Sequence, residues 1–441
     1  MLNLGYLPFF KINTELFQEN MMKAEKLSFS QAQNTKSIVD TTPVLDVHTH
    51  IYDSNFGKLL LWGIDDLLTY HYLIAEVFRV APISYDRFWA MSKSEQADYI
   101  WKHLFIERSP LSEASRGVVT LLNELNFDST DRNLDTIREF FTDITIEEYI
   151  DLVFEKAGVR EVIMTNDPFD ESERLVWEGE LKRDKRFRAA LRIDRLLTDW
   201  DKACNDLVSW GYEVEKRLGD WTLSEIRRFI SDWVKIMKPA YMAASLPPTF
   251  TYPDVSPCGR IIDNCILPVG KEYGLPFSMM IGVKKQVNPH LKLAGDSIGK
   301  ADISALERLC SEHHHNKFLV TMLSRENQHE LCVTARKFSN LMIFGCWWFL
   351  NNPSIMEEIT RERLELLGLS MIPQHSDARI LDQLIYKWKH SRKVIADVLA
   401  DKYAGLVEAG WKINENDVKR DVEQLFGGIF DQFVGKENRV T

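Results

Sequence analysis

Eight short apolar segments constrain the fold of this chain more than any other feature of its sequence. They span residues 43–49, 161–167, 187–194, 240–247, 276–283, 317–323, 340–348 and 370–377. Most are continuous apolar runs rather than alternating ones, which is typical of parallel strands buried on both faces. Stretches with helical apolar spacing, such as residues 223–237, lie between them. Eight strand-then-helix units predict an α/β fold, a distorted TIM (β/α)8 barrel.

The spacing of these segments predicts an insertion after the first strand. The first two segments begin at residues 43 and 161, 118 residues apart, whereas later neighbours begin 23 to 53 residues apart. One helical pattern in the long gap opens with Thr145 and Glu148, a capping-box pair, and stops at Gly158. We therefore expect four regions: an N-terminal extension and lead-in helix at 1–40, a barrel at 41–55 and 160–380, a helical insertion subdomain at 56–159, and C-terminal helices packed on the barrel at 381–441.

Composition narrows the class of partner. The chain has 54 Lys+Arg against 65 Asp+Glu, and a net charge of −11 argues against a nucleic-acid binder held through phosphates. No apolar run approaches the roughly 18 residues of a membrane span, so no membrane partner is expected. The six cysteines form no CxxC pair, and the N-terminus has neither a basic start nor a small-residue cleavage site. We expect a cytoplasmic protein, peripheral residues 1–20, and a small-molecule ligand. Homo-oligomer formation is left open.

Two histidines at the end of the first segment predict a metal site. His48 and His50 are two residues apart, so on a regular strand they share a face and can both point into the barrel mouth. Asp377, at the end of the eighth segment, could reach the same ion from the other side of the rim. The alternatives are histidines bonded to nearby backbone and an aspartate that caps the helix starting near Ile380. The combined pattern favours one divalent metal ion held by all three residues.

The same residues carry a family resemblance. A first-strand His-x-His paired with an eighth-strand aspartate is similar to the amidohydrolase superfamily, and the match narrows to the uronate (glucuronate) isomerases. The matching residues are 46–50, 68–72, 165–168, Arg192, Trp347, Trp348 and 377–379, within a similarity that runs from about residue 40 to 435. The resemblance implies reversible aldose–ketose isomerisation of a hexuronate through an enediol. D-Glucuronate would give D-fructuronate, and D-galacturonate would give D-tagaturonate.

The sequence departs from the superfamily pattern at several strand ends. Hydrolytic members usually add metal-binding histidines at strands five and six and often a lysine at strand four. Here strand five carries Met280, where many uronate isomerases keep a histidine, strand six ends in 322–325 without one, and strand four lacks an inward lysine. We therefore expect a single ion, zinc by the resemblance, on which activity need not strictly depend.

The resemblance also implies catalytic roles. Asp377 is the first choice for deprotonating the C2 hydroxyl or assisting enolisation, and His71 and Tyr72 could shuttle protons on the other face of the sugar. Arg379 would stabilise the developing negative charge. The group that takes the carbon-bound proton stays unassigned. His375, two residues before Asp377, is expected to support a metal ligand from behind.

Substrate contacts are expected from cationic and aromatic residues. Arg192, at the end of the third strand, is the candidate for the C6 carboxylate, with Arg379 as the other cation in reach and His71 as a further contact. The alternative for Arg192 is a salt bridge to an aspartate, either Asp194 or Asp184. Trp347 and Trp348 follow the seventh strand, where alternation suggests that only one of them faces the ligand.

Two other classes of function compete with the isomerase. A metal-dependent hydrolase acting on a lactone, ester or amide is disfavoured because the histidines at strands five and six are missing. A barrel that binds a sugar acid without turning it over is disfavoured because a binder does not need this acid–base set. The isomerase is the preferred hypothesis.

Overall fold

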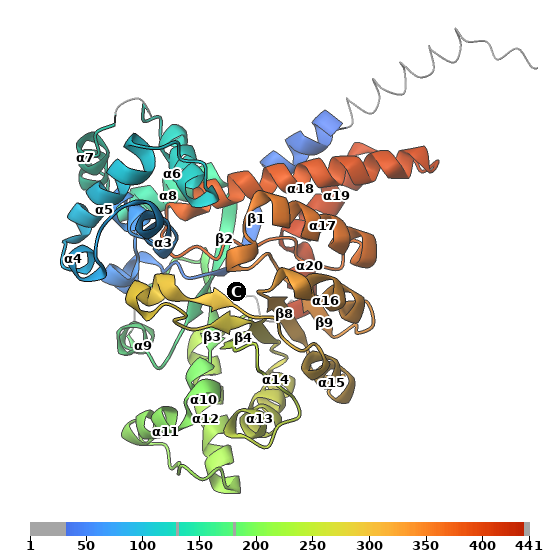
Figure 1. The fold of residues 1–441 in the computed structure, drawn as a ribbon. Coiled ribbons are helices and arrows are strands. Elements are labelled where there is room, and N and C mark those ends of the chain that lie inside the picture. Colours follow the sequence, from blue (N-terminus) through green and yellow to red (C-terminus); the bar gives the residue numbers. More distant parts are fainter. Residues whose placement is uncertain (1–31, 129–131, 180–181, 436–441) are drawn as a thin grey trace, which may run out of the picture.

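The computed structural model describes residues 32–128, 132–179 and 182–435. Parallel strands form one curled sheet in the order β1-β2-β3-β4-β5-β8-β9 (Figure 1). The strands are β1 (Val44–Thr49), β2 (Val159–Asn166), β3 (Phe187–Arg192), β4 (Met242–Leu246), β5 (Phe277–Ile281), β8 (Phe318–Met322) and β9 (Leu341–Ile343). Seven of the eight predicted segments therefore form parallel strands, and the predicted α/β barrel is confirmed. The N-terminal extension up to residue 31 lies outside the described residues.

The eighth predicted segment closes the barrel without forming a regular strand. On one side, Ile372 accepts from Gly345 N at 2.9 Å and donates to Ile343 O at 3.0 Å. On the other side, Asp377 N donates to His48 O at 3.1 Å, and His50 N donates to Ala378 O at 2.8 Å. A regular ladder fails between these pairs because Pro373 has no N–H and Asp377 has a left-handed φ of 51°. The barrel is distorted at this seam.

Helices of three groups surround the sheet. Between β1 and β2 lie α2 (Ile64–Leu68), α3 (His71–Val80), α4 (Tyr85–Trp89), α5 (Lys93–Trp101), α6 (Glu113–Glu124), α7 (Asp135–Asp143) and α8 (Ile146–Ala157), which gather on one side of the barrel in Figure 1. Among the strands lie α9 (Glu171–Glu178), α10 (Asp194–Thr198), α11 (Trp200–Ser209), α12 (Asp220–Met237), α13 (Pro257–Ile261), α14 (Leu267–Tyr273), α15 (Ser304–Glu312), α16 (Gln328–Ala335) and α17 (Pro353–Leu367). After the seam come α18 (Gln383–Glu408), α19 (Glu415–Glu423) and α20 (Ile429–Val434).

Local sequence signals account for the ends of α8. Thr145 accepts from Glu148 N while the Glu148 side chain accepts from Thr145 N, and the helix ends at Gly158 with φ 62°. The predicted capping box and stop are thus confirmed. The long helix α18 packs against α6 and α8 of the insertion and against α17 of the barrel (Figure 1). None of the described helices combines the length and apolar character needed to span a membrane.

A small hairpin that the sequence did not predict follows β5. Strands β6 (Val283–Lys284) and β7 (Ser297–Ile298) pair antiparallel around a short turn of helix. The hairpin reaches the inserted helices: Trp89 Nε1 donates to His290 O at 2.9 Å, and the His290 ring stacks on Tyr85. This contact ties the insertion to the barrel on the side where the strands end.

Candidate active site

Three predicted ligands meet where the first strand and the closing segment run side by side. His48 Nε2 lies 3.6 Å and His50 Nε2 lies 3.4 Å from Asp377 Oδ1. One ligand atom from each residue lies within 4.8 Å of the others, which is a spacing that one metal ion could bridge. The group sits at the carboxyl ends of the strands, the face on which barrel enzymes place their chemistry. The predicted meeting of these three side chains is confirmed.

The first strand reaches this arrangement through an irregularity rather than through regular alternation. The pairing of β1 with β2 shifts register between Asp46 and Thr49. Asp46 turns outward to accept from Trp388 Nε1 of α18 at 2.8 Å, while Val47 lies in the barrel interior. His48 also faces the interior, where its ring contacts Phe344. The bulge therefore changes the face to which His48 points, a recurrent device next to active sites.

Hydrogen bonds fix which ring nitrogen of each histidine faces Asp377. The hydroxyl of Tyr241 donates to Val47 O at 2.8 Å and lies 3.2 Å from His48 Nδ1, so it accepts from that nitrogen. The hydroxyl of Thr165 donates to Thr49 O at 3.0 Å and lies 2.8 Å from His50 Nδ1, so it accepts there. A neutral imidazole with its proton on Nδ1 presents a lone pair at Nε2. Both lone pairs face the aspartate.

The electrostatics of the group fit a bound cation. Burial lowers the pKa of His48 and of His50, which keeps both rings neutral. Burial alone would raise the pKa of Asp377, but the positive charge that its neighbours His50, His48 and Lys387 can carry lowers it below its ordinary value, so the carboxylate stays ionised. His48 Nε2 is buried and has no hydrogen-bond partner among the described residues. Two imidazole lone pairs and a carboxylate are the donor set that zinc takes in three-ligand sites.

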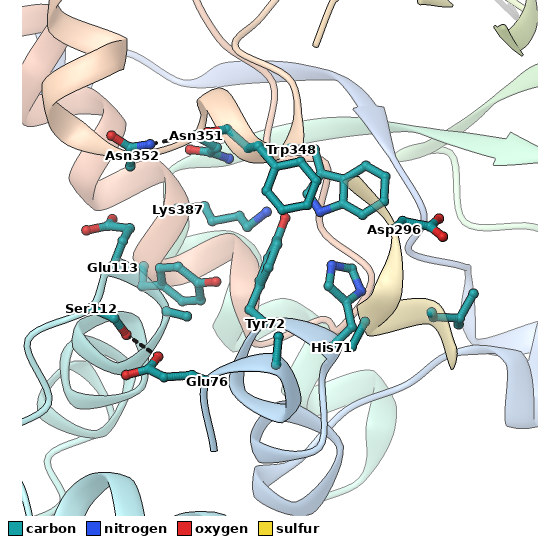
Figure 2. A pocket seen from close by; sticks show the side chains of 16 residues that line it. His71, Tyr72, Glu76, Ser112, Glu113, Asp296, Trp348, Asn351, Asn352 and Lys387 are labelled. Atoms are coloured by element: carbon teal, nitrogen blue, oxygen red, sulfur yellow. Dashed lines mark hydrogen bonds between the residues drawn. The ribbon is translucent and has the colours of Figure 1, made fainter. Parts of the chain in front are cut away.

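A cavity of about 410 Å³ lies beside this group and is lined by residues from the insertion, the hairpin, the segment after β9 and α18. Figure 2 shows its lining and labels His71, Tyr72, Glu76, Ser112, Glu113, Asp296, Trp348, Asn351, Asn352 and Lys387; Tyr386 also lines it. The pKa of His71 falls to about 4 mainly through burial, while the charge of Asp377 opposes the fall. Its Nε2 has no hydrogen-bond partner in the described part of the chain. A neutral imidazole facing a cavity near a carboxylate can accept or relay a proton.

The two tryptophans have different surroundings. The ring of Trp348 lies 5.4 Å from that of His71, and Trp348 lines the cavity. Trp347 is buried in the interior cluster with Met280 and Leu323. The structure thus brings Trp348, but not Trp347, to the cavity.

The predicted arginines flank the histidine group. Arg192 donates from Nε and Nη2 to both oxygens of Asp194 at 3.0 and 2.9 Å. This is the salt bridge expected from the sequence as the alternative to substrate contact. Arg379 donates from Nη1 to His50 O at 3.1 Å and to Leu59 O at 2.9 Å. Neither arginine lines the cavity of Figure 2. Their charges nevertheless reach the site, since both contribute to lowering the pKa of His50.

His375 is buried behind the metal ligands. Its ring lies 5.0 Å from that of His48, and neither of its ring nitrogens bonds to any described residue. Gly345 makes room for it, because a Cβ at that position would lie 1.9 Å from His375 Cδ2. The ring supports His48 by packing alone.

The sequence assigned no role to three residues that the structure places at the site: Tyr241, Thr165 and Lys387. Tyr241 opens a strand and looks like core, and Thr165 lies within a matched segment without any assigned role. Lys387 occurs in a helix next to Lys389, where a lysine is ordinarily solvated. Only their three-dimensional neighbours mark them, so no local signal could have found them.

The barrel, the ligand group at its mouth and the acid–base cavity beside it define an amidohydrolase-like enzyme. No protein-family model matches the sequence, and no curated protein does. The solved structure of an uronate isomerase from Bacillus halodurans C-125 is 55% identical, with a TM-score of 0.91 over 92% of this chain and 97% of that one. The chain therefore belongs to the uronate isomerase family.

Two more distant structures share the fold. An uronate isomerase from Thermotoga maritima matches 92% of this chain and 97% of its own at a TM-score of 0.75 and 15% identity. A glucuronate isomerase from Caulobacter crescentus matches 92% of this chain and 94% of its own at a TM-score of 0.73 and 14% identity. At these identities the likeness shows the fold alone.

Proposed function

We propose that this chain is a uronate isomerase that interconverts D-glucuronate with D-fructuronate and D-galacturonate with D-tagaturonate. The observation that carries the proposal is the 55% identity to an uronate isomerase over 92% of the chain. The geometry supports it, because an acid–base cavity adjoins a group of ligands that could bind one ion. The substrate is a free hexuronate, and the net charge of −11 requires local cations to capture it.

His48, His50 and Asp377 would hold one divalent ion, and we propose zinc. When bound, such an ion polarises the oxygen atoms of the sugar and lowers the cost of negative charge on them. The buried Nε2 of His48 and the ionised carboxylate support this assignment. Met280 fills the strand-five position inside the barrel, and β8 offers no histidine, which supports a single ion in the proposal.

The acid–base work falls to groups around the cavity. Asp377 would move the hydroxyl proton between O2 and O1. His71 and Tyr72 lie on the insertion side, with ring centroids 4.3 Å apart, and would handle protons on the opposite face of the sugar. Trp348 would pack on the sugar, while Arg192 and Arg379 would supply the positive field for the carboxylate and for developing oxyanion charge.

Two measurements test the proposal. Incubation with D-glucuronate or D-galacturonate should form the ketose, and in deuterated water the product should gain solvent deuterium if a proton moves through an enediol. Asp377→Asn should abolish turnover while the protein stays folded. If neither sugar gives a ketose, the proposed function is refuted. An active Asp377→Asn variant would refute the role of that residue.

A mononuclear metal-dependent hydrolase of the amidohydrolase superfamily remains the second candidate because it shares the barrel. Two-metal hydrolases of the superfamily need further histidines on β5 and β8. The sequences of these two strands, FSMMI and FLVTM, contain none. Assays with lactones and esters separate the two functions. We also propose a cytoplasmic location, which the six free cysteines support.

A further inference from the structure

A buried lysine projects into the cavity from the long helix α18. Lys387 is 5% exposed, and its Nζ donates to Ser376 O at 2.6 Å. Ser376 directly precedes Asp377, so the ammonium is anchored one residue from the proposed hydroxyl base. An amine with three donor hydrogens retains two when one is bound to a carbonyl.

The ammonium faces the acid–base residues. Figure 2 shows Lys387 pointing toward Tyr72, with His71 and Trp348 across the cavity. Its Nζ lies 5.7 Å from the centroid of the Tyr72 ring. Its charge helps to lower the pKa of Asp377 and that of His71. Lys387 therefore lies at the reacting end of the site.

The other charges near the cavity are already partnered. Glu113 is held by Arg116 at 2.6 Å, Glu76 accepts from Ser112 at 2.5 Å, and Asp296 accepts from Gln286 N at 2.7 Å. Lys387 is the cationic residue in the described lining of this cavity, since Arg192 and Arg379 lie outside it.

We propose that Lys387 is a catalytic residue of the isomerisation, whose ammonium stabilises the negative charge that develops on the substrate oxygen at C1. When a base takes the C2 proton, the C–H electrons form the C1–C2 double bond, and the carbonyl electrons move onto O1. The free N–H groups of Lys387 donate to that oxygen and favour the transition state over the ground state. Asp377 would then move the O2 proton to O1, and return of a proton to C1 turns the C1–C2 double bond into the C2 carbonyl, so the transfer needs neither an oxidant nor a reductant. This inference rests on the proposed uronate isomerase function.

Charge and hydrogen bonding can be separated by substitution. Lys387→Gln keeps a donor but loses the charge, Lys387→Arg keeps the charge, and Lys387→Met loses both. Lys389→Met is the matched control, because Lys389 lies on the same helix, is 52% exposed and pairs with Glu124. Loss of one preorganised oxyanion donor typically lowers kcat about 10²- to 10³-fold.

We expect the glutamine and methionine variants to lose kcat by about that factor with KM for D-glucuronate changed less than about threefold. The arginine variant should recover part of the loss, and Lys389→Met should match the wild type. A hydroxamate analogue of the uronate, which mimics the enediolate, should lose affinity in parallel with kcat. Titration with Zn²⁺ should give unchanged affinity, because the three ligands remain.

Other results overturn the inference. A rise in KM with unchanged kcat would indicate that Lys387 binds the carboxylate of the substrate rather than the reacting oxygen. Affinity for Zn²⁺ and melting temperature could fall together, while hydroxamate affinity falls no more than substrate affinity. That result would indicate that Lys387 only stabilises the Ser376–Asp377 turn. Unchanged kcat in both uncharged variants would leave it no role. These outcomes differ from failure of the proposed function, in which the wild type itself forms no ketose.

Discussion

Replacing Thr165 by valine tests whether the hydrogen bonds behind the histidines prepare a metal site. The Thr165 hydroxyl lies 2.8 Å from His50 Nδ1 and itself donates to Thr49 O, so it can only accept from the imidazole. Valine has nearly the same shape but cannot accept. The Nδ1–H would then lack its partner, and the competing tautomer, with the proton on Nε2, would block the lone pair that faces Asp377.

The size of the effect follows from burial. Thr165 is 1% exposed, so water does not readily replace the lost acceptor. A buried donor left without a partner costs about 1–3 kcal/mol, which corresponds to roughly 5- to 150-fold in affinity. Loss of an outer partner of a metal-bound histidine typically costs 10- to 100-fold, in agreement. We expect Zn²⁺ to bind Thr165→Val about 10- to 100-fold more weakly than the wild type.

Competition titration of the metal-free protein with a chromophoric chelator measures this difference. Thr321→Val is the matched control, because Thr321 is equally buried but its hydroxyl has no hydrogen-bond partner among the described residues. That variant should bind Zn²⁺ as the wild type does. Equal affinity in Thr165→Val, or an equal loss in both variants, would refute the assignment of the Nδ1 tautomer to His50.

Three further predictions concern stability and substrate capture. Burial raises the pKa of Glu173 from 4.5 to about 7, so between these pH values the folded state holds a proton that the unfolded state releases. The free energy of unfolding should therefore fall by about 3 kcal/mol as the pH rises from below 4.5 through 7. Glu173→Gln should flatten this fall in thermal unfolding, and an unchanged slope would contradict it. Gly345→Ala should cost about 2–4 kcal/mol, because Gly345 has φ 66° and a Cβ would strike His375. Gly274→Ala, also with φ 66° but with open space around the site, should cost only about 1–2 kcal/mol in chemical denaturation, and equal losses would argue against the clash. Arg192→Met should raise KM for D-glucuronate about tenfold or more with a smaller change in kcat, and unchanged saturation would reject its contact with the carboxylate.

The fold was predictable because its signal is repeated. Seven separate apolar segments each had to be buried on both faces, and an error in one of them would have left the parallel barrel unchanged. The site ligands were predictable for a related reason. The ends of the parallel segments meet on one face, so the end of the first segment and the end of the closing segment were expected side by side, although the direction of the Asp377 carboxylate depends on the irregular seam.

The supporting residues were not predictable, since they depend on side chains that meet across the chain. Alternation places Asp46 and His48 on one face, yet the bulge sends Asp46 to Trp388 and His48 to Tyr241. Nothing in the local sequence marks this break. Lys387 resembles any other helical lysine until α18 is packed against the seam.

The seam between the first strand and the closing segment combines closure of the barrel with construction of the site. Asp46 accepts from Ser376 N at 3.0 Å, Lys387 donates to Ser376 O at 2.6 Å, and Asp377 N donates to His48 O at 3.1 Å. These bonds hold Asp377 at a positive φ of 51°, a conformation that a non-glycine residue keeps only when its surroundings enforce it. A regular eighth strand would have closed the barrel with ladder bonds and turned the carboxylate elsewhere. The irregular closure is therefore what aims Asp377 at the two histidines.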